Sequence, residues 1–172
     1  MGRMGGPGDR LNDLRHVKTS ARVSSSRGAA EPALRVVTRF FELSTRGHTD
    51  ILDVTNRVQE VVSATGLQEG QATVFVVGST AGITTVEYEP GLVEDLKAFF
   101  ERLAPAGAAY RHEEAWHDGN GYAHVRSAFL KTSFVTPFAG GKLMLGTWQQ
   151  LVLIDFDNRP RKRRVVVRVV GR

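Results

Sequence analysis

The sequence of 172 residues contains no cysteine. Disulfides, thiolate metal ligands and cysteine nucleophiles are therefore excluded, and any metal ion would have to be held by His, Asp, Glu or Asn side chains. No apolar run approaches the length that crosses a bilayer, and the N-terminus lacks the apolar segment of a secretory signal. We expect a soluble, cytoplasmic protein that does not bind a membrane.

Large apolar residues are scarce at the N-terminus. Residues 1–33 are rich in Gly, Ser, Arg and Ala and show no periodicity, which predicts a disordered, basic extension. An organelle-targeting peptide is the alternative, but Asp9, Asp13 and the early glycines count against it. Residues 34–172 are enough for one domain with its own core.

Acidic residues are scarce only at the two ends of the chain. Residues 1–35 carry seven Lys and Arg against three acids, and residues 159–172 carry seven with no acid. Residues 36–158 carry nine basic residues against fifteen acidic ones. A nucleic-acid-binding domain would interleave basic and aromatic residues on its folded part. The charge distribution therefore disfavours nucleic-acid binding, apart from weak, salt-sensitive contacts of the ends.

The hydrophobic pattern predicts a single α+β domain, in which an antiparallel or mixed sheet packs with two main helices and one short helix. The segment "LRVVTRFFELST" is typical of a strand, and "QATVFVVG" of a buried central strand. A helix over 49–66 would begin at Thr49 or Asp50 and end at Gly66. The other expected elements are a helix over 89–105, a short helix over 123–130, and strands over 133–171 joined by hairpin turns at 139–141 and 157–160.

The first candidate site is a dense group of polar side chains before and within the short helix. Imidazoles and carboxylates in one loop can bind a divalent ion or a phosphate-bearing substrate, and histidine exchanges protons near neutral pH. His117 also fits a simple polar loop residue. His124 and Ser127 share one helix face, and the spacing leaves open whether His124 is functional or only forms a hydrogen bond. The group comprises His112, His117, Asp118, Asn120 and His124.

Two further segments carry candidate chemistry. In "GSTAGITTVEYEPG", glycines and the hydroxyls of Ser79 and Thr80 follow a strand, an arrangement suited to holding an anion. A tight connection with a short strand explains the same pattern. In "LGTWQQLVLIDFD", Gly146 interrupts an apolar run, and Trp148 and Gln149 need partners for their polar atoms. A subunit contact accounts for this segment equally well.

Taken in order, these segments resemble the YjbQ family, small proteins labelled as secondary thiamine-phosphate synthases. The resemblance covers about Leu34 to Gly171. Its most specific part is "GKLMLGTWQQLVLIDFD" followed by "RPRKRRVVVRVVG", and "DGNGYAHVRSAFLKTS" and "GSTAGITTVEYEPGLVEDL" match the preceding family segments. This chain has Gly78 where many relatives have histidine, and Lys131 where many have glycine.

The resemblance implies an α+β fold around an antiparallel sheet, assembled as a homotrimer with the polar motifs near subunit boundaries. It also implies a reaction that joins hydroxymethylpyrimidine diphosphate to a thiazole phosphate and releases pyrophosphate. A metal- or small-ligand-binding trimer without dedicated catalysis is the alternative. Under the enzymatic interpretation, the catalytic residues and ligands of a divalent metal, Zn²⁺ or Mg²⁺, are His112, Asp118 and His124. The substrate-binding residues are Asn120, Ser127, Gln149 and Arg126.

Overall fold

The computed structural model describes residues 33–172, so the predicted extension lies outside the described residues except for Ala33. The described part has an α+β fold with eight strands and four helices. In chain order these are β1 (Arg35–Thr45), β2 (Asp50–Asp53), α1 (Thr55–Ala64), β3 (Glu69–Val76), β4 (Ala81–Val86), α2 (Pro90–Leu103), α3 (His112–Trp116), α4 (Gly121–Leu130), β5 (Ser133–Ala139), β6 (Lys142–Leu143), β7 (Gln150–Asp155) and β8 (Arg161–Gly171).

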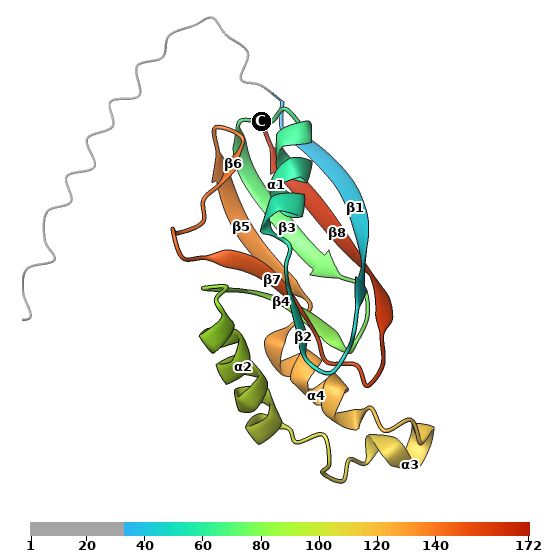
Figure 1. Ribbon diagram of the computed structural model, residues 1–172. Coiled ribbons are helices and arrows are strands. Elements are labelled where there is room, and N and C mark those ends of the chain that lie inside the picture. The colour runs from blue at the N-terminus through green and yellow to red at the C-terminus, as the bar shows by residue number, and fades with distance from the viewer. Residues whose placement is uncertain (1–32) are drawn as a thin grey trace, which may run out of the picture. The chain divides into compact units, whose positions relative to one another are not determined.

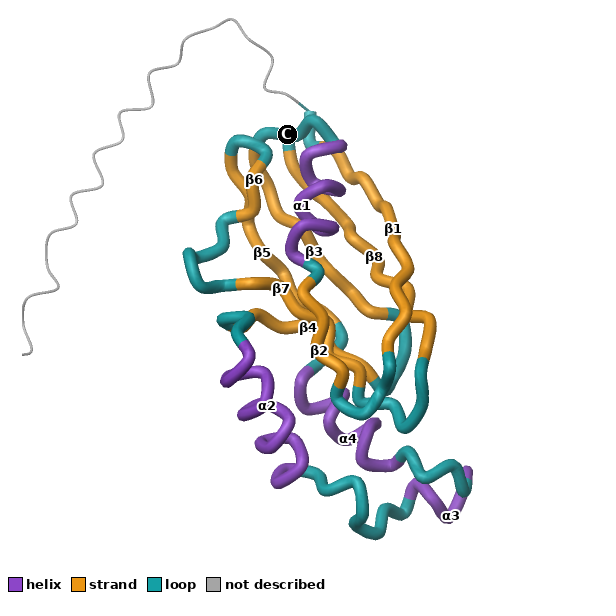
Figure 2. Tube along the Cα trace, viewed as in Figure 1, coloured by secondary structure: helices purple, strands orange, loops and turns teal. Residues whose placement is uncertain are grey.

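The strands form two antiparallel sheets (Figure 2). The large sheet has the order β1-β8-β3-β5-β6, and the small sheet has the order β2-β7-β4. The C-terminal strand β8 lies inside the large sheet and pairs with β1 on one side and β3 on the other. The two ends of the folded part are thereby held together by backbone hydrogen bonds.

The small sheet is buried on both faces. Leu151 and Leu153 of β7 belong to a core shared with α1 and the large sheet. Val152 and Ile154 belong to a second core shared with α2 and α4, and Figure 1 shows these two helices beside the small sheet. Burial on both faces explains why "LVLI" is continuously apolar. Each such side chain contributes about 1.5–3 kcal/mol through burial.

The large sheet is buried on one face only. In β8, buried residues alternate with less buried ones from Arg163 onward. The predicted strand β3 is central, as expected, but its residues also alternate, so only one of its faces is in the core. The outer face carries exposed apolar side chains, among them Phe40, Phe75 and Val135.

The helix predicted over 49–66 is shorter than expected. Residues Asp50–Asp53 form β2, which pairs with β7, and α1 begins only at Thr55 after the N-cap residue Val54. Asp50 does not cap a helix, because its carboxylate accepts hydrogen bonds from the backbone and guanidinium of Arg46. The apolar residues whose spacing suggested one long helix belong to two different cores. Ile51 packs with α2 and α4 in the second core, whereas Val58 packs against the large sheet in the first.

The predicted hairpin turn at 157–160 is also different. β7 and β8 lie in different sheets, so this turn carries the chain from one sheet to the other. The predicted hairpin turn at 139–141 is confirmed, because it joins the paired strands β5 and β6.

The helices differ from the prediction in detail. The helix α2 is confirmed, although Phe99 and Leu103 on its expected inner side are each 41% exposed and Phe100 alone is fully buried. The helix α4 begins at Gly121, two residues earlier than predicted, and the expected loop before it contains α3. None of the helices within residues 33–172 has the length and apolarity required of a membrane span.

Candidate functional site

The helices α3 and α4 bring two histidines together. The carboxylate of Glu113 accepts hydrogen bonds from the backbone N–H of Gly119 at 2.6 Å and of Gly121 at 2.9 Å. These bonds lower the pKa of Glu113 and fix α3 beside the first turn of α4. As a result, the ring centroids of His112 and His124 are 4.4 Å apart.

Asp118 joins this pair. Its Oδ1 atom lies 3.6 Å from Nε2 of His112, and this buried nitrogen has no hydrogen-bond partner among the described residues. A buried nitrogen without a partner is costly, so such atoms are unusual in folded proteins. The three predicted catalytic residues therefore lie side by side, whereas His117 is exposed beyond the end of α3.

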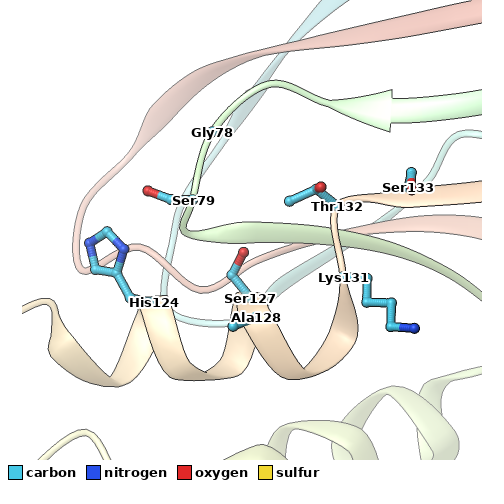
Figure 3. Close-up of a pocket in the computed structure, with 8 residues that line it drawn as sticks. All are labelled: Gly78, Ser79, His124, Ser127, Ala128, Lys131, Thr132 and Ser133. Atoms are coloured by element: carbon cyan, nitrogen blue, oxygen red, sulfur yellow. The ribbon is translucent and has the colours of Figure 1, made fainter.

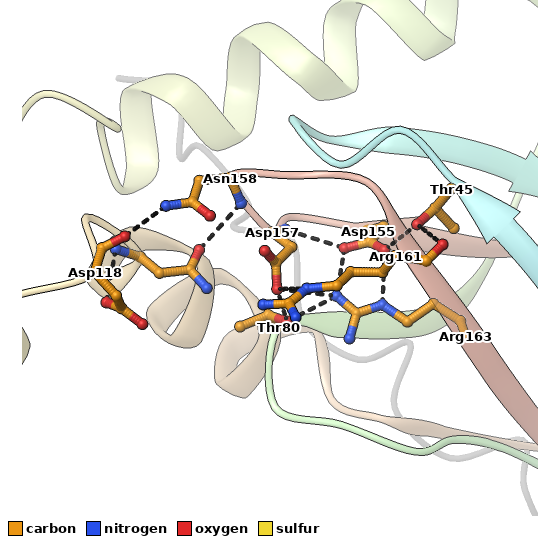
Figure 4. Close-up of polar contacts among 9 residues, drawn as sticks. Thr45, Thr80, Asp118, Asp155, Asp157, Asn158, Arg161 and Arg163 are labelled. Atoms are coloured by element: carbon orange, nitrogen blue, oxygen red, sulfur yellow. Dashed lines mark hydrogen bonds and ion pairs between the residues drawn. The ribbon is translucent and has the colours of Figure 1, made fainter. Parts of the chain in front are cut away.

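Asn120 connects the loop between α3 and α4 to the turn between β7 and β8, and Figure 4 labels Asp118 in the first and Asn158 in the second. Its side-chain oxygen accepts the backbone N–H of Asn158 at 3.2 Å, and the Asn158 amide donates to the backbone oxygen of Asp118 at 2.7 Å. Asn120 is only 3% exposed, so it mainly holds the loop in place. A small cavity of about 260 Å³ opens beside these residues, between Asp118 and Arg161.

A larger cavity of about 540 Å³ lies next to His124 (Figure 3). In Figure 3, the imidazole of His124 points toward the connection that carries Gly78 and Ser79. The first and second candidate segments of the sequence thus meet at one cavity. Its lining residues are Gly78, Ser79, His124, Ser127, Ala128, Lys131, Thr132 and Ser133.

His124 is adapted to be uncharged at neutral pH. Partial burial lowers the pKa of its imidazole, and the neighbouring His112 lowers it further. No described residue forms a hydrogen bond with this imidazole. A neutral imidazole carries one N–H donor and one acceptor lone pair, so His124 can offer both to a ligand in the cavity.

Lys131 has an unusual backbone conformation at the end of α4. Its φ of 73° and ψ of 156° belong to a region that favours glycine, and holding another residue there costs about 1–3 kcal/mol. Its side chain lines the cavity, but its ammonium group is directed away from His124 in Figure 3. Lys131 therefore places positive charge at one end of the cavity and not beside the imidazole.

The side chains of the remaining predicted site residues form hydrogen bonds within the fold, although Ser127 also lines the cavity at His124. The Ser127 hydroxyl donates to the backbone oxygen of Ala81 at 2.7 Å, which ties α4 to β4. Arg126 is buried and donates to the backbone of Ala104 and to the side chains of Thr49 and Glu101. Gln149 donates to the hydroxyl of Thr85. Arg126 and Gln149 do not line the cavity at His124.

The predicted metal ligands are neighbours but do not form a ligand cage. Within residues 33–172, no group of three or more His, Asp or Glu side chains is arranged to hold a metal ion. The donor set would suit a transition metal by its chemistry, and a metal at His112, Asp118 and His124 stays a prediction.

The sequence reasoning missed a buried ionic network beside the cavity (Figure 4). The guanidinium of Arg163 donates to both carboxylate oxygens of Asp155, at 2.7 and 2.6 Å, and to the hydroxyl of Thr80 at 2.7 Å. Asp157 lies 3.4 Å from the same guanidinium and 2.8 Å from Nε of Arg161. Burial raises the pKa of Asp157, but the close guanidinium of Arg161 and the hydrogen bond from Thr80 outweigh it, so the net pKa is lowered.

Comparisons with known proteins agree with this fold. A family model described as "UPF0047 protein YjbQ-like" matches residues 39–172. A UPF0047 protein of Archaeoglobus fulgidus is 37% identical over 74% of this chain and 97% of its own length. One of Synechocystis is 40% identical over 67% of this chain and 80% of its own length.

Solved structures give the same result. A YbjQ-like protein of unknown function from Sulfolobus solfataricus has a TM-score of 0.77 and 30% identity, with 81% of this chain and 100% of that chain covered. A hypothetical protein from Aeropyrum pernix has a TM-score of 0.74 and 34% identity, with 79% and 99% covered.

Proposed function

Because this chain belongs to the YjbQ-like UPF0047 family, we propose that its cavity at His124 binds a phosphorylated small molecule and that the reaction is thiamine-phosphate synthesis. The observation that carries the proposal is the meeting of His124 with Ser79, Thr132 and Ser133 at one cavity of about 540 Å³. Small-molecule sites commonly have volumes of about 300–1,000 Å³.

The chemistry of the lining suits a diphosphate leaving group. In this reaction the bond between the pyrimidine methylene carbon and the diphosphate oxygen breaks, and a bond to the thiazole nitrogen forms. Charge develops on the departing pyrophosphate, which hydrogen-bond donors in a preorganised site stabilise. The hydroxyls of Ser79, Thr132 and Ser133 would donate to its oxygens, and Lys131 would supply positive charge.

His124 would orient the substrate in this mechanism. Its pKa is lowered, so a neutral ring would donate one hydrogen bond to a phosphate oxygen and accept another from the substrate. A divalent metal, if one binds, would be held by His112, Asp118 and His124 and would neutralise diphosphate charge. Since these side chains form no ligand cage, no step of the mechanism passes through a metal.

Complementation of a thiamine auxotroph tests the proposed reaction. The unmodified chain is expected to restore growth, and His124→Ala is expected to abolish the rescue. The matched control is His117→Ala, which alters an exposed histidine in the loop before α4 and should rescue normally. Failure of the unmodified chain to make thiamine phosphate from purified substrates would remove the synthase reaction, and rescue by His124→Ala would remove His124 from it.

A second candidate function is binding of a metal or small ligand by a homotrimer without dedicated catalysis. The unpartnered Nε2 of His112, 3.6 Å from Asp118, favours this alternative. Elemental analysis of purified protein, followed by zinc titration of the metal-free chain, tests the metal form. Binding of one zinc ion per chain, and loss of this binding in His112→Ala, would support metal binding. A purified protein that contains no metal and shows no affinity for zinc would eliminate it.

A further inference from the structure

Arg163 is held rigidly beside the cavity. Three of its contacts, from Nε and Nη2 to Asp155 and from Nη2 to Thr80, are 2.6–2.7 Å long. The residue is only 7% exposed. Its remaining nitrogen, Nη1, donates to no residue that the structure describes. Nη1 is not one of the buried side-chain atoms without a partner, so it is accessible to solvent and can donate to a ligand while the other two nitrogens hold the guanidinium in place.

Gly78 separates this nitrogen from the cavity without covering it. A Cβ atom at position 78 would lie 3.0 Å from Nη1 of Arg163, and Gly78 is itself a lining residue of the cavity. Its φ of 136° also favours glycine. The missing side chain leaves Nη1 without a covering methyl group beside Gly78, and Figure 3 shows Gly78 on the connection that faces His124.

We propose that Arg163 is an oxyanion-binding residue, which reaches an anionic group of the ligand through the gap left by Gly78. This deepens the proposed function, on which it rests, by naming the residue that recognises the phosphate. Lys131 cannot take this role beside His124, because its ammonium is directed away. A guanidinium anchored by two carboxylates keeps its position while its free N–H forms a strong, charge-assisted bond to a phosphate oxygen.

Titration of the full chain with inorganic pyrophosphate tests this role. Gly78→Ala places a methyl group against Nη1 and is expected to weaken pyrophosphate binding roughly tenfold or more, as the loss of one charge-assisted hydrogen bond requires. The control is Gly140→Ala, which alters a glycine with φ of 57° where an added Cβ would meet no heavy atom within 4 Å. Gly140 does not line the cavity, so this variant should bind pyrophosphate normally.

A second readout needs no variant to fold. In the unmodified chain, the guanidinium NMR resonances of Arg163, assigned through bonds from its backbone signals, should shift saturably with pyrophosphate. Unchanged Arg163 resonances, or unweakened pyrophosphate binding by folded Gly78→Ala, would overturn the proposal.

If both effects occur but no thiamine phosphate is made, Arg163 stands as an anion-binding residue and the synthase reaction fails. If thiamine phosphate is made without either effect, the reaction stands and Arg163 has no part in it.

Discussion

The lowered pKa of His124 links its burial to pH-dependent stability. The unfolded chain binds a proton on this histidine near its ordinary pKa of about 6.5, whereas the folded chain binds it only at lower pH. The free energy of unfolding should therefore hold its full value above about pH 6.5 and fall as the pH drops below it. Carboxylates such as Glu113, whose pKa is also lowered, lose stability in a separate range at still lower pH.

Urea denaturation between about pH 5 and pH 8 measures this effect. In His124→Gln, the fall in unfolding free energy just below about pH 6.5 should be smaller than in the unmodified chain. His117→Gln changes an exposed histidine in the loop before α4 and should leave the fall unchanged. An identical pH profile for His124→Gln and the unmodified chain would show that His124 does not cause the fall in unfolding free energy.

The buried network around Arg163 predicts a large stability loss on its removal. Arg163→Ala leaves the carboxylate of Asp155 buried without its cation and removes the more distant of the two cations near Asp157, which should lower the free energy of unfolding by about 3–5 kcal/mol. Arg164→Ala removes an exposed neighbour whose partner Glu42 lies 3.2 Å away and should cost about 1 kcal/mol or less. Similar losses for both variants, in chemical denaturation, would show that the network does not stabilise the fold.

Sequence reasoning reached some of these residues and missed others for identifiable reasons. His112, Asp118 and His124 stand within one short segment, so their contact required only a turn between two helices. Arg163 is far from them in the chain, and the basic residues of this end were considered only for their net charge. The sequence did contain an indication of its role. Arg163 lies at the same alternate positions of β8 as Val165, Val167 and Val169, which form its buried face. A charged side chain on a buried face needs a partner of opposite charge.

At the scale of elements, close contact of β4 with the end of α4 positions the cavity. A Cβ at Gly82 would lie 2.6 Å from a methyl carbon of Leu130 and 2.7 Å from the backbone oxygen of Lys131. Gly82→Ala should therefore push α4 away from β4, lower the unfolding free energy by about 1–3 kcal/mol and weaken pyrophosphate binding.

The control for this prediction is Gly107→Ala. A Cβ added at Gly107 would meet no heavy atom within 4 Å, so the change should affect stability by about 0.5 kcal/mol or less. Thermal unfolding combined with anion titration measures both effects. A Gly82→Ala chain with unchanged stability and binding would contradict the proposed coupling between β4 and α4.

Strands and helices were predictable from the sequence where the apolar residues of a segment followed a single strand-like or helix-like spacing. The strand β1 and the helix α2 follow clear patterns, and Pro90 marks the first turn of α2. The elements within residues 49–66 were not predictable, because the apolar residues of the short strand β2 and of the helix α1 together have the spacing of one amphipathic helix. Sheet membership was not predictable either, since the turn at 157–160 reads locally as a hairpin while long-range pairing places β7 and β8 in different sheets.

At the scale of the whole molecule, exposed apolar residues favour self-assembly. Phe40, Phe75 and Val135 on the outer face of the large sheet are 60%, 39% and 51% exposed, and an exposed apolar face of this kind marks a contact site. We expect light scattering to give a mass three times that of the 18.9 kDa chain. A monomer at micromolar concentration would contradict the homotrimer.

The central claim is that the cavity at His124 binds an anionic, phosphorylated ligand. Histidine NMR spectra recorded during a pyrophosphate titration of the unmodified chain test it most directly, with each ring assigned by its substitution. We expect saturable shifts for His124 and none for the exposed His117. Spectra in which His124 does not shift, or in which His117 shifts equally, would contradict the claim.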